Sequence, residues 1–252
     1  MSIRVDLYLS ANGYSKSRTS AQKSIREGCV EIDGVIVRKE SDRIDETREH
    51  NVKIIATCPY VSRGGLKLEA ALNAFSVDVR GLSALDIGAS TGGFTDCLLQ
   101  HGASKVCALE NGSGQLDEKL RNDPRVYSVE NVNARHLNAS MLPFQPSLVV
   151  MDVSFISQTL ILPVLHDIMD PDSLFISLVK PQFEVGRQAI GKGGIVKDEK
   201  SAKDALLHVI ECAGSCGIGI EGYIDSPIPG GDGNKEYLIF GRKKSGKGGS
   251  CD

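Results

Sequence analysis

Residues 84–96, Ala-Leu-Asp-Ile-Gly-Ala-Ser-Thr-Gly-Gly-Phe-Thr-Asp, constrain the fold of this chain most strongly. An apolar run ends at Ile87, a glycine-rich turn spans Gly88 to Gly93, and a stretch with helical apolar spacing follows. A strand, a glycine turn and a helix in this order predict the first unit of a nucleotide-binding α/β domain, where free backbone N–H groups meet a ligand. A dinucleotide site needs the spacing G-x-G-x-x-G. Glycines at 88, 92 and 93 therefore argue against a dinucleotide.

An acidic residue completes this motif. Asp86 precedes the turn, and the resulting D-x-G-x-x-x-G-G pattern resembles motif I of class I S-adenosylmethionine methyltransferases. The resemblance implies S-adenosyl-L-methionine as cofactor, a ligand with an amino-acid tail and no phosphate. The alternative is a tight turn without a ligand, which three glycines disfavour because glycine carries an entropic cost.

Composition sets the broad class of protein. The chain has 252 residues, 41% hydrophobic and 24% charged, which fits one globular domain of ordinary size plus a small one. The net charge is −3, so any affinity for nucleic acid must come from a local basic patch. We expect a cytoplasmic protein without a membrane partner, since no apolar run approaches about 20 residues and no signal-peptide pattern begins the chain. Seven cysteines without a Cys/His cluster predict reduced thiols and no metal site.

The first 45 residues predict a small α+β module. Apolar positions at helical spacing (Val5 to Leu9, Ala21 and Ile25) come before alternating Val30 and Ile32 and an Asp33-Gly34 turn, which indicates a hairpin. Between residues 15 and 26 there are four basic side chains and no acid. This charge fits either a phosphate-facing surface or a solvated helix face.

The wider pattern of this module favours the first interpretation. Arg4-x-Asp-x-x-Leu, Ser17-Arg18, Ile25-x-x-Gly28 and Asp33-Gly34 resemble the RNA-binding domain first known from ribosomal protein S-four. The resemblance implies recognition of folded RNA through shape and backbone. We expect RNA contacts at Arg4, Lys16, Arg18, Lys23, Arg26 and Arg63.

Strand-like runs alternate with helical stretches through the rest of the chain. They predict an α/β domain with a mostly parallel, doubly wound sheet, whose strands end at Asp86, Glu110, Asp152 and Lys180. Runs at 218–224 and 236–240 close the sheet. Lys180 needs a partner after its apolar strand, and Asp152 is the candidate, either for a structural ion pair or for chemistry. The segment 186–193 begins like a phosphate-binding P-loop but lacks its Ser/Thr, so we interpret it as a glycine-rich loop near the substrate.

Several motifs together extend the resemblance to most of the chain. Ser62-Arg-Gly-Gly-Leu-Lys67, Met151-Asp-Val-Ser-Phe-Ile156, Val179-Lys-Pro-Gln-Phe-Glu184 and Gly233-Asn-Lys-Glu-Tyr237 resemble the TlyA-type proteins, historically labelled haemolysins. The resemblance implies an RNA-binding domain with linker (1–59), an FtsJ/RrmJ-like, Rossmann-like class I methyltransferase domain (60–243) and a disordered tail (244–252). It also implies 2′-O-methylation of cytidine in 16S or 23S ribosomal RNA, with ribosomal RNA or subunits as partner and no protein partner predictable.

The family's Lys-Asp-Lys-Glu tetrad maps by motif onto Lys67, Asp152, Lys180 and Glu236. A ribose 2′-hydroxyl is a poor nucleophile and must lose its proton as it attacks. A free lysine is protonated at neutral pH, and a second ammonium nearby favours its neutral form. We assign Lys180 as the base, beside Lys67 and oriented by Asp152. Glu236 is expected to hold Lys67 or the ribose.

The same resemblance implies a cofactor site with Glu110 on the ribose hydroxyls. The expected residues are Asp86, Gly88, Ser90, Thr91, Gly92, Gly93, Phe94, Glu110, Asn133 and Asp152. The chain departs from the family at Asn111, where valine is expected, and at 56–60, where some relatives carry a basic-aromatic linker. Two alternatives stay open: a non-catalytic RNA-binding or ribosome-assembly protein, which the intact tetrad disfavours, and haemolysin-like activity of indirect origin.

Overall fold

The computed structural model describes residues 2–26, 28–37, 39–54, 58–230 and 233–245 and divides into two compact units, Met1–Arg63 and Gly64–Asp252. The predicted disordered tail lies mostly outside the described residues, from 246 onward. None of the described helices has the length and apolar character needed to cross a membrane.

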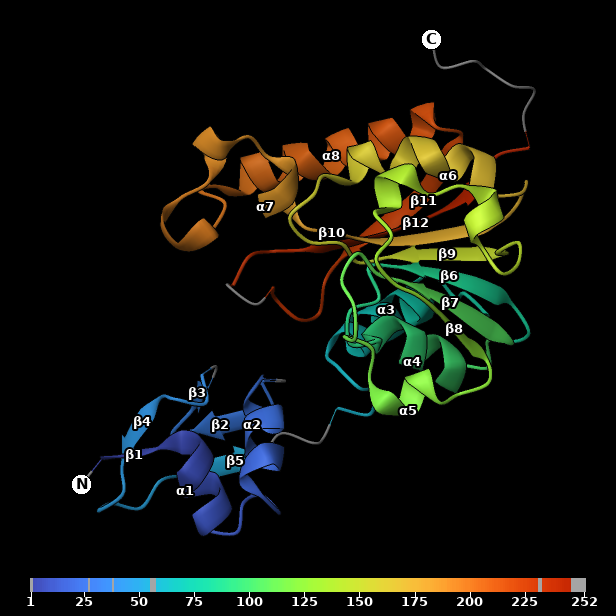
Figure 1. The fold of residues 1–252 in the computed structure, drawn as a ribbon. Coiled ribbons are helices and arrows are strands. Elements are labelled where there is room, and N and C mark those ends of the chain that lie inside the picture. Colours follow the sequence, from blue (N-terminus) through green and yellow to red (C-terminus); the bar gives the residue numbers. More distant parts are fainter. Residues whose placement is uncertain (1, 27, 38, 55–57, 231–232, 246–252) are drawn as a thin grey trace. The chain divides into compact units, whose positions relative to one another are not determined.

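The N-terminal unit combines two helices with short antiparallel strands (Figure 1). Its elements are β1 (Ser2–Arg4), α1 (Val5–Ala11), α2 (Arg18–Arg26), β2 (Val30–Ile32), β3 (Val35–Ile36), β4 (Arg43–Asp45) and β5 (Val52–Ile54). Strand β2 lies between β3 and β5, and β1 pairs with β4. The predicted hairpin is confirmed: Asp33 and Gly34 turn with φ of 53° and 82°, the left-handed region that glycine and aspartate tolerate.

The core of this unit follows from the predicted helix faces. Val5 and Leu9 of α1, one helical turn apart, pack with Ala21 and Ile25 of α2 against the inner face of β2. Helix α2 begins only at Arg18, so Lys16 precedes the helix rather than lying on it. Of the four basic residues counted between residues 15 and 26, Lys16 therefore lies outside the helix.

His50 connects the hairpin turn to β4. Its side chain is 2% exposed; Nδ1 lies 2.7 Å from Asp33 Oδ2, and Nε2 lies 2.8 Å from the carbonyl oxygen of Asp45. Because both partners are acceptors, the ring satisfies both only when it is doubly protonated. The Asp33 carboxylate, followed by the Asp45 carbonyl, accordingly raises the pKa of His50, while Arg48 beside the same carboxylate opposes this. The pKa of Asp33 is lowered in turn, chiefly by His50.

We expect this contact to make the N-terminal unit less stable at alkaline than at mildly acidic pH. A histidine whose pKa is raised on folding contributes its full stabilisation below the unfolded value of about 6.5 and loses it as pH rises through the folded value. Hydrogen exchange of the β2 and β5 amides, corrected for intrinsic rates, should show more frequent opening at pH 8.5 than at pH 6. His50→Gln should remove that difference; an equal pH dependence in the variant would refute the assignment.

The C-terminal unit is a seven-stranded sheet between two helical layers (Figure 1). Its helices are α3 (Gly64–Ala74), α4 (Gly93–Gln100), α5 (Glu118–Arg121), α6 (Leu162–Ile168), α7 (Pro181–Glu184) and α8 (Glu199–Ser215). Its strands are β6 (Ser83–Ile87), β7 (Lys105–Leu109), β8 (Val126–Val129), β9 (Leu148–Met151), β10 (Leu174–Val179), β11 (Ile218–Asp225) and β12 (Tyr237–Lys243). Single 3-10 turns lie between them, η1 (Ala134–His136), η2 (Ala139–Met141), η3 (Gln158–Leu160), η4 (Arg187–Ala189) and η5 (Lys192–Gly194).

The strand order is β11-β12-β10-β9-β6-β7-β8, with β10 through β8 parallel. Figure 1 shows α3 and α4 on one face and α6 and α8 on the other. Because both faces are covered, strands such as β9 and β10 are buried almost throughout and read as continuous apolar runs. The predicted doubly wound, mostly parallel sheet is thus confirmed. The last two strands close it in antiparallel fashion, with β12 inserted between β10 and β11.

Candidate active site

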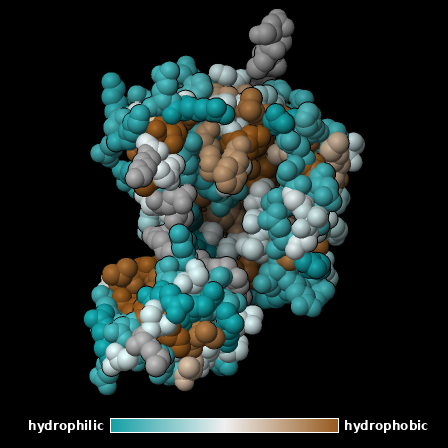
Figure 2. Space-filling model, turned by 60° about the vertical axis from the view of Figure 1, so that its left-hand side comes forward, coloured by the Kyte–Doolittle hydropathy of each residue, from teal (hydrophilic) through white to brown (hydrophobic). Residues whose placement is uncertain are grey.

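The carboxyl ends of β6, β7 and β9 border a cavity of about 870 Å³, a size typical of small-molecule sites. The chain order reverses between β6 and β9, where ligands of open α/β sheets bind. Five residues predicted to bind the cofactor line the cavity: Gly88, Ser90, Glu110, Asn133 and Asp152. Figure 2 shows apolar side chains exposed on this C-terminal unit within a largely hydrophilic surface.

The turn after β6 depends on glycine at two positions. Gly88 has φ of +83°, and a Cβ there would lie 2.5 Å from the backbone oxygen of Asp152. Gly92 has φ of +94°, and its Cβ would lie 2.2 Å from Leu120 Cδ1. A side chain at either position would meet both backbone strain and a clash. The predicted glycines therefore allow the turn to approach the neighbouring segments closely.

Asp86 is completely buried beneath this turn. Its Oδ2 accepts a hydrogen bond of 2.6 Å from Thr95 Oγ1, while Oδ1 is buried without a hydrogen-bond partner among the described residues. Burial, helped by the nearby Asp152 charge and opposed by Thr95, raises the pKa of Asp86 to about 7. An orphaned carboxylate oxygen fits a ligand that brings N–H donors and positive charge, as S-adenosylmethionine does.

The other predicted cofactor residues divide into two groups. Glu110 accepts from the backbone N–H groups of Ser90 at 3.0 Å and Gly112 at 2.9 Å, so its carboxylate ties the turn after β6 to the turn after β7. Asn133 caps η1 by accepting from Arg135 N at 3.1 Å. The residues that do not line the cavity are Asp86, Thr91, Gly92, Gly93 and Phe94. Phe94 is 3% exposed within α4, so its direct contact with a cofactor stays a prediction.

The four tetrad residues form two ion pairs. Lys180 Nζ lies 2.5 Å from Asp152 Oδ1 and donates to Ser154 Oγ at 2.9 Å. Lys67 Nζ, from α3, donates to Glu236 Oε2 at 2.5 Å, and these two side chains are only 11% and 3% exposed. The contact between Lys180 and Asp152 was expected from the ends of their strands, and the contact between Lys67 and Glu236 was one of the two roles expected for Glu236. Buried partners of opposite charge hold each other in one geometry.

Strand register explains why Asp152, Lys180 and Glu236 share one edge of the sheet. The β10–β12 ladder ends with Val179 opposite Tyr237, so Lys180 and Glu236 follow at the same edge. In the β6–β9 pair Ile87 lies opposite Met151, which places Asp152 next to Gly88 at the cavity. Asp152 therefore belongs to both the cavity wall and the Lys180 ion pair.

Phe155 was not predicted from the sequence as a site residue. It lines the cavity, is 91% exposed and has φ of +63°, a strained conformation for a bulky side chain. Its ring centroid lies 5.0 Å from that of Phe183. A large exposed aromatic ring beside Asp152 and Ser154 is unusual outside a binding surface.

In the N-terminal unit, a buried carboxylate organises two of the predicted RNA contacts. Asp6 is 0% exposed and accepts from Arg4 Nε and Arg18 Nε, both at 2.9 Å, and from Gln22 Nε2 at 2.7 Å. The Arg4 hydrogen bond, more than its other partners, holds the pKa of Asp6 well below its usual range. Arg4 and Arg18 are 33% and 50% exposed, so their outer edges remain accessible.

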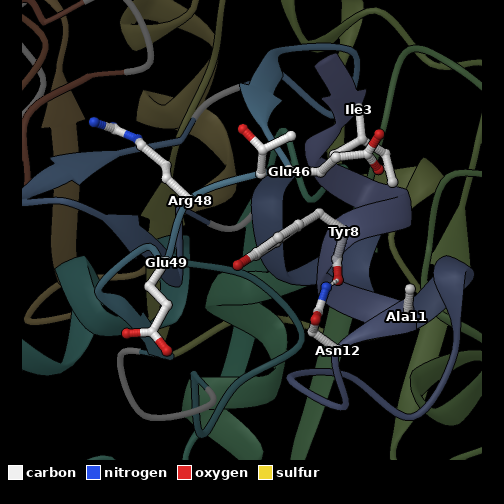
Figure 3. Close-up of a pocket in the computed structure, with 8 residues that line it drawn as sticks. Ile3, Tyr8, Ala11, Asn12, Glu46, Arg48 and Glu49 are labelled. Carbon is white, nitrogen blue, oxygen red and sulfur yellow. Dashed lines mark hydrogen bonds between the residues drawn. The ribbon is translucent and has the colours of Figure 1, made fainter. Parts of the chain in front are cut away.

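The other predicted RNA contacts are less closely grouped. Lys16 is exposed before α2, and the Arg63 guanidinium lies against Gly28, where a Cβ would be 2.9 Å from it. The side chains of Lys23 and Arg26 lie outside the described residues. A hollow of about 390 Å³ in the same unit (Figure 3) is lined by Tyr8 of α1, by Asn12 directly after α1 and by residues 46–49, with two glutamates and one arginine. None of the predicted RNA contacts lines it.

A doubly wound sheet with a glycine turn, a buried acid beneath it and a cavity at the carboxyl edge define an S-adenosylmethionine-dependent methyltransferase. The chain belongs to the FtsJ-like methyltransferases, whose family model matches residues 60–243, and an S4 domain matches residues 3–49. The family resemblance inferred from the motifs is thereby confirmed.

Two curated relatives and one solved structure resemble the whole chain. "Hemolysin A" of Brachyspira hyodysenteriae is 44% identical over 237 residues, covering 94% of this chain and 98% of that protein. The "16S/23S rRNA (cytidine-2'-O)-methyltransferase TlyA" of Mycobacterium tuberculosis is 42% identical over 242 residues, covering 96% of this chain and 90% of that protein. A solved structure from Streptococcus thermophilus that carries the hemolysin name is 40% identical, with a TM-score of 0.76 over 97% of this chain and 89% of that one.

Proposed function

We propose that this protein transfers a methyl group from S-adenosylmethionine to the ribose 2′-hydroxyl of a cytidine in 16S or 23S ribosomal RNA, in the cytoplasm. The observation that carries the proposal is the Lys180–Asp152 pair at the rim of the cofactor cavity. The M. tuberculosis relative named for cytidine 2′-O-methylation of both ribosomal RNAs supports the choice of substrate.

The cofactor, when bound, supplies a methyl group on a positively charged sulfonium. The side chains of the protein must remove the proton from the attacking hydroxyl. In this proposal neutral Lys180 accepts that proton at Nζ, and the Asp152 carboxylate, 2.5 Å away, stabilises the resulting ammonium. The Lys67–Glu236 pair is assigned to hold the ribose. Because the carboxyl groups of Glu110 and Asp152 line the cavity, the site suits a cationic cofactor.

Radiolabelled S-adenosylmethionine tests this proposal directly. The protein is incubated with separate small and large subunits and with their naked RNAs, and the product is digested and mapped. We expect label in a 2′-O-methylcytidine. Label on a base would overturn the reaction type. No label, with cofactor binding confirmed by calorimetry, would favour a non-catalytic RNA-binding protein.

Phe155 is positioned to hold the target base. Its side chain is exposed, its backbone has a positive φ, and the neighbouring Ser154 contacts Lys180. An exposed ring next to the proton acceptor suits a flipped base, because every base has a flat face that stacks on an aromatic side chain. In our proposal the target cytosine stacks on Phe155.

We expect Phe155→Ala to reduce methyl transfer without changing cofactor affinity. Base–aromatic stacking contributes about 1–3 kcal/mol, so kcat/KM for RNA should fall about five- to hundredfold. Phe155→Tyr, which keeps the flat ring, should retain most activity when methyl transfer is measured with the radiolabelled cofactor. Full activity in the alanine variant would exclude the stacking role.

A further inference from the structure

The segment that follows β9 carries much of the site but has little regular structure. It contains Asp152, Ser154 and Phe155 and reaches a 3-10 turn only at Gln158. Phe155 holds a positive φ, which persists only where the surroundings over-determine it. Polar side chains behind the site hold this segment in place.

Glu184 makes the main connection. It is the last residue of α7, the short helix that begins directly after Lys180. Its Oε2 accepts from Ser157 Oγ at 2.6 Å and its Oε1 accepts from the backbone N–H of Gln158 at 2.9 Å. Burial raises the pKa of Glu184, and the two hydrogen bonds and His208 of α8 oppose that rise. A half-buried carboxylate with two donors is a costly feature to keep unless its geometry matters.

Gln158 extends the connection to the strands. Its side chain is 1% exposed; Nε2 donates to the Leu178 carbonyl at 2.7 Å, and Oε1 accepts from Ser177 Oγ at 2.7 Å. Ser177 also approaches the carbonyl oxygen of Met151 at 3.3 Å. Met151 immediately precedes Asp152, and Leu178 lies two residues before Lys180. The hydrogen-bond network therefore reaches the backbone within two residues of both Asp152 and Lys180.

The two segments are joined at both ends. At one end Lys180 meets Asp152, at the other Glu184 meets Ser157 and Gln158, and between them the Phe155 and Phe183 rings are in contact. We propose that Glu184 is a positioning residue, which holds residues 152–158 so that Asp152 and Phe155 keep their geometry toward Lys180 and the substrate. This inference rests on the proposed function. Nothing in the sequence pattern assigned Glu184 a role.

Three variants test the inference in the full-length protein. Glu184→Ala removes both acceptors, Glu184→Gln keeps an acceptor of the same length, and Glu211→Ala removes an exposed carboxylate elsewhere, on α8. Misplacement of reacting groups by about 1 Å costs roughly 100-fold. We expect Glu184→Ala to lower kcat roughly 100-fold. The rate is divided by the number of cofactor-binding sites, which calorimetry measures. Its KM for RNA should stay within threefold, Glu184→Gln should recover much of the rate, and Glu211→Ala should match wild type.

A double-mutant comparison separates positioning from general destabilisation. Ser157→Ala removes one of the two donors to Glu184, so it should cause a smaller loss, and adding it to Glu184→Ala should cost nothing more. Additive losses would overturn the inference. The inference would also be overturned if the kcat of Glu184→Ala stayed within threefold of wild type. It would equally be overturned if the lower activity of Glu184→Ala came only from a smaller number of cofactor sites.

Hydrogen exchange supplies a readout independent of turnover. Glu184→Ala should increase exchange of the amides in residues 152–160 and leave β6 and β7 unchanged. If wild type fails to methylate ribosomal RNA, the proposed function fails, while this exchange pattern still decides whether Glu184 holds the segment. Unchanged exchange at 152–160 would refute the positioning role.

Discussion

Replacing Lys180 with alanine should abolish most methyl transfer while leaving cofactor binding nearly unchanged. Lys180 Nζ contacts Asp152 and Ser154 at the rim of the cavity, yet Lys180 itself does not line the cavity. A general base contributes roughly 100- to 10,000-fold to rate, so single-turnover rates should fall by that factor. The cofactor dissociation constant, measured by calorimetry, should stay within a few-fold of wild type.

Two further variants make this result specific. Lys180→Arg keeps a positive charge beside Asp152 but cannot become a neutral base, so it should be about as inactive as the alanine variant. Lys105→Ala removes a lysine at the amino end of β7, at the opposite edge of the sheet, and should retain wild-type activity. Substantial turnover in Lys180→Arg would remove Lys180 as the base.

The order of strands along the chain could be predicted because the central strands are covered on both faces. Such strands read as apolar runs, and the first charged residue marks where each run reaches the sheet edge. Glu110, Asp152 and Lys180 were located in this way, each directly after its strand, whereas Asp86 lies inside β6, one residue before the strand ends. The direction of β11 and β12 could not be predicted, since an apolar run carries no information about whether its neighbour is parallel. The pairing of β1 with β4 involves three residues on each strand, too few for a recognisable pattern.

The contacts within the candidate site were partly predictable from charge. A lysine at the end of an apolar strand requires a buried partner, and Asp152 at the end of an adjoining strand was the natural one; the structure confirms that contact. Lys67 and Glu236 are far apart in sequence, and only the family motifs connected them before the structure did. The catalytic roles of the four residues remain a proposal.

Phe155 and Glu184 show what sequence reasoning misses. Phe155 is exposed and has a positive φ, and no residue pattern reveals either feature. Glu184 acts on residues 26 and 27 positions earlier, through a packing of α7 against η3 that only the tertiary fold creates. Similarly, Asp6 gathers Arg18 and Gln22 from another helix, although the sequence suggested only a basic surface.

The Asp6 cluster gives the N-terminal unit an ordered basic surface. Arg4 and Arg18 each use the Nε side of the guanidinium on Asp6, which leaves other N–H groups of both arginines available to phosphate oxygens. A fixed guanidinium loses less entropy on binding than a free one. The unit therefore fits the proposed role of an RNA-binding module tethered to the methyltransferase unit.

Deleting residues 1–63 should weaken binding to the ribosomal substrate roughly 100- to 10,000-fold, because a tethered second module multiplies affinity by about that factor. Cofactor affinity should stay within about threefold, since the cavity is lined by residues 87 to 161. Filter binding over a range of salt concentrations measures the first quantity and calorimetry the second. As a graded control, Lys16→Ala in the full chain should reduce the salt dependence by roughly one phosphate contact. If the deletion weakens cofactor and RNA binding equally, the N-terminal unit supports the methyltransferase fold instead of holding the RNA.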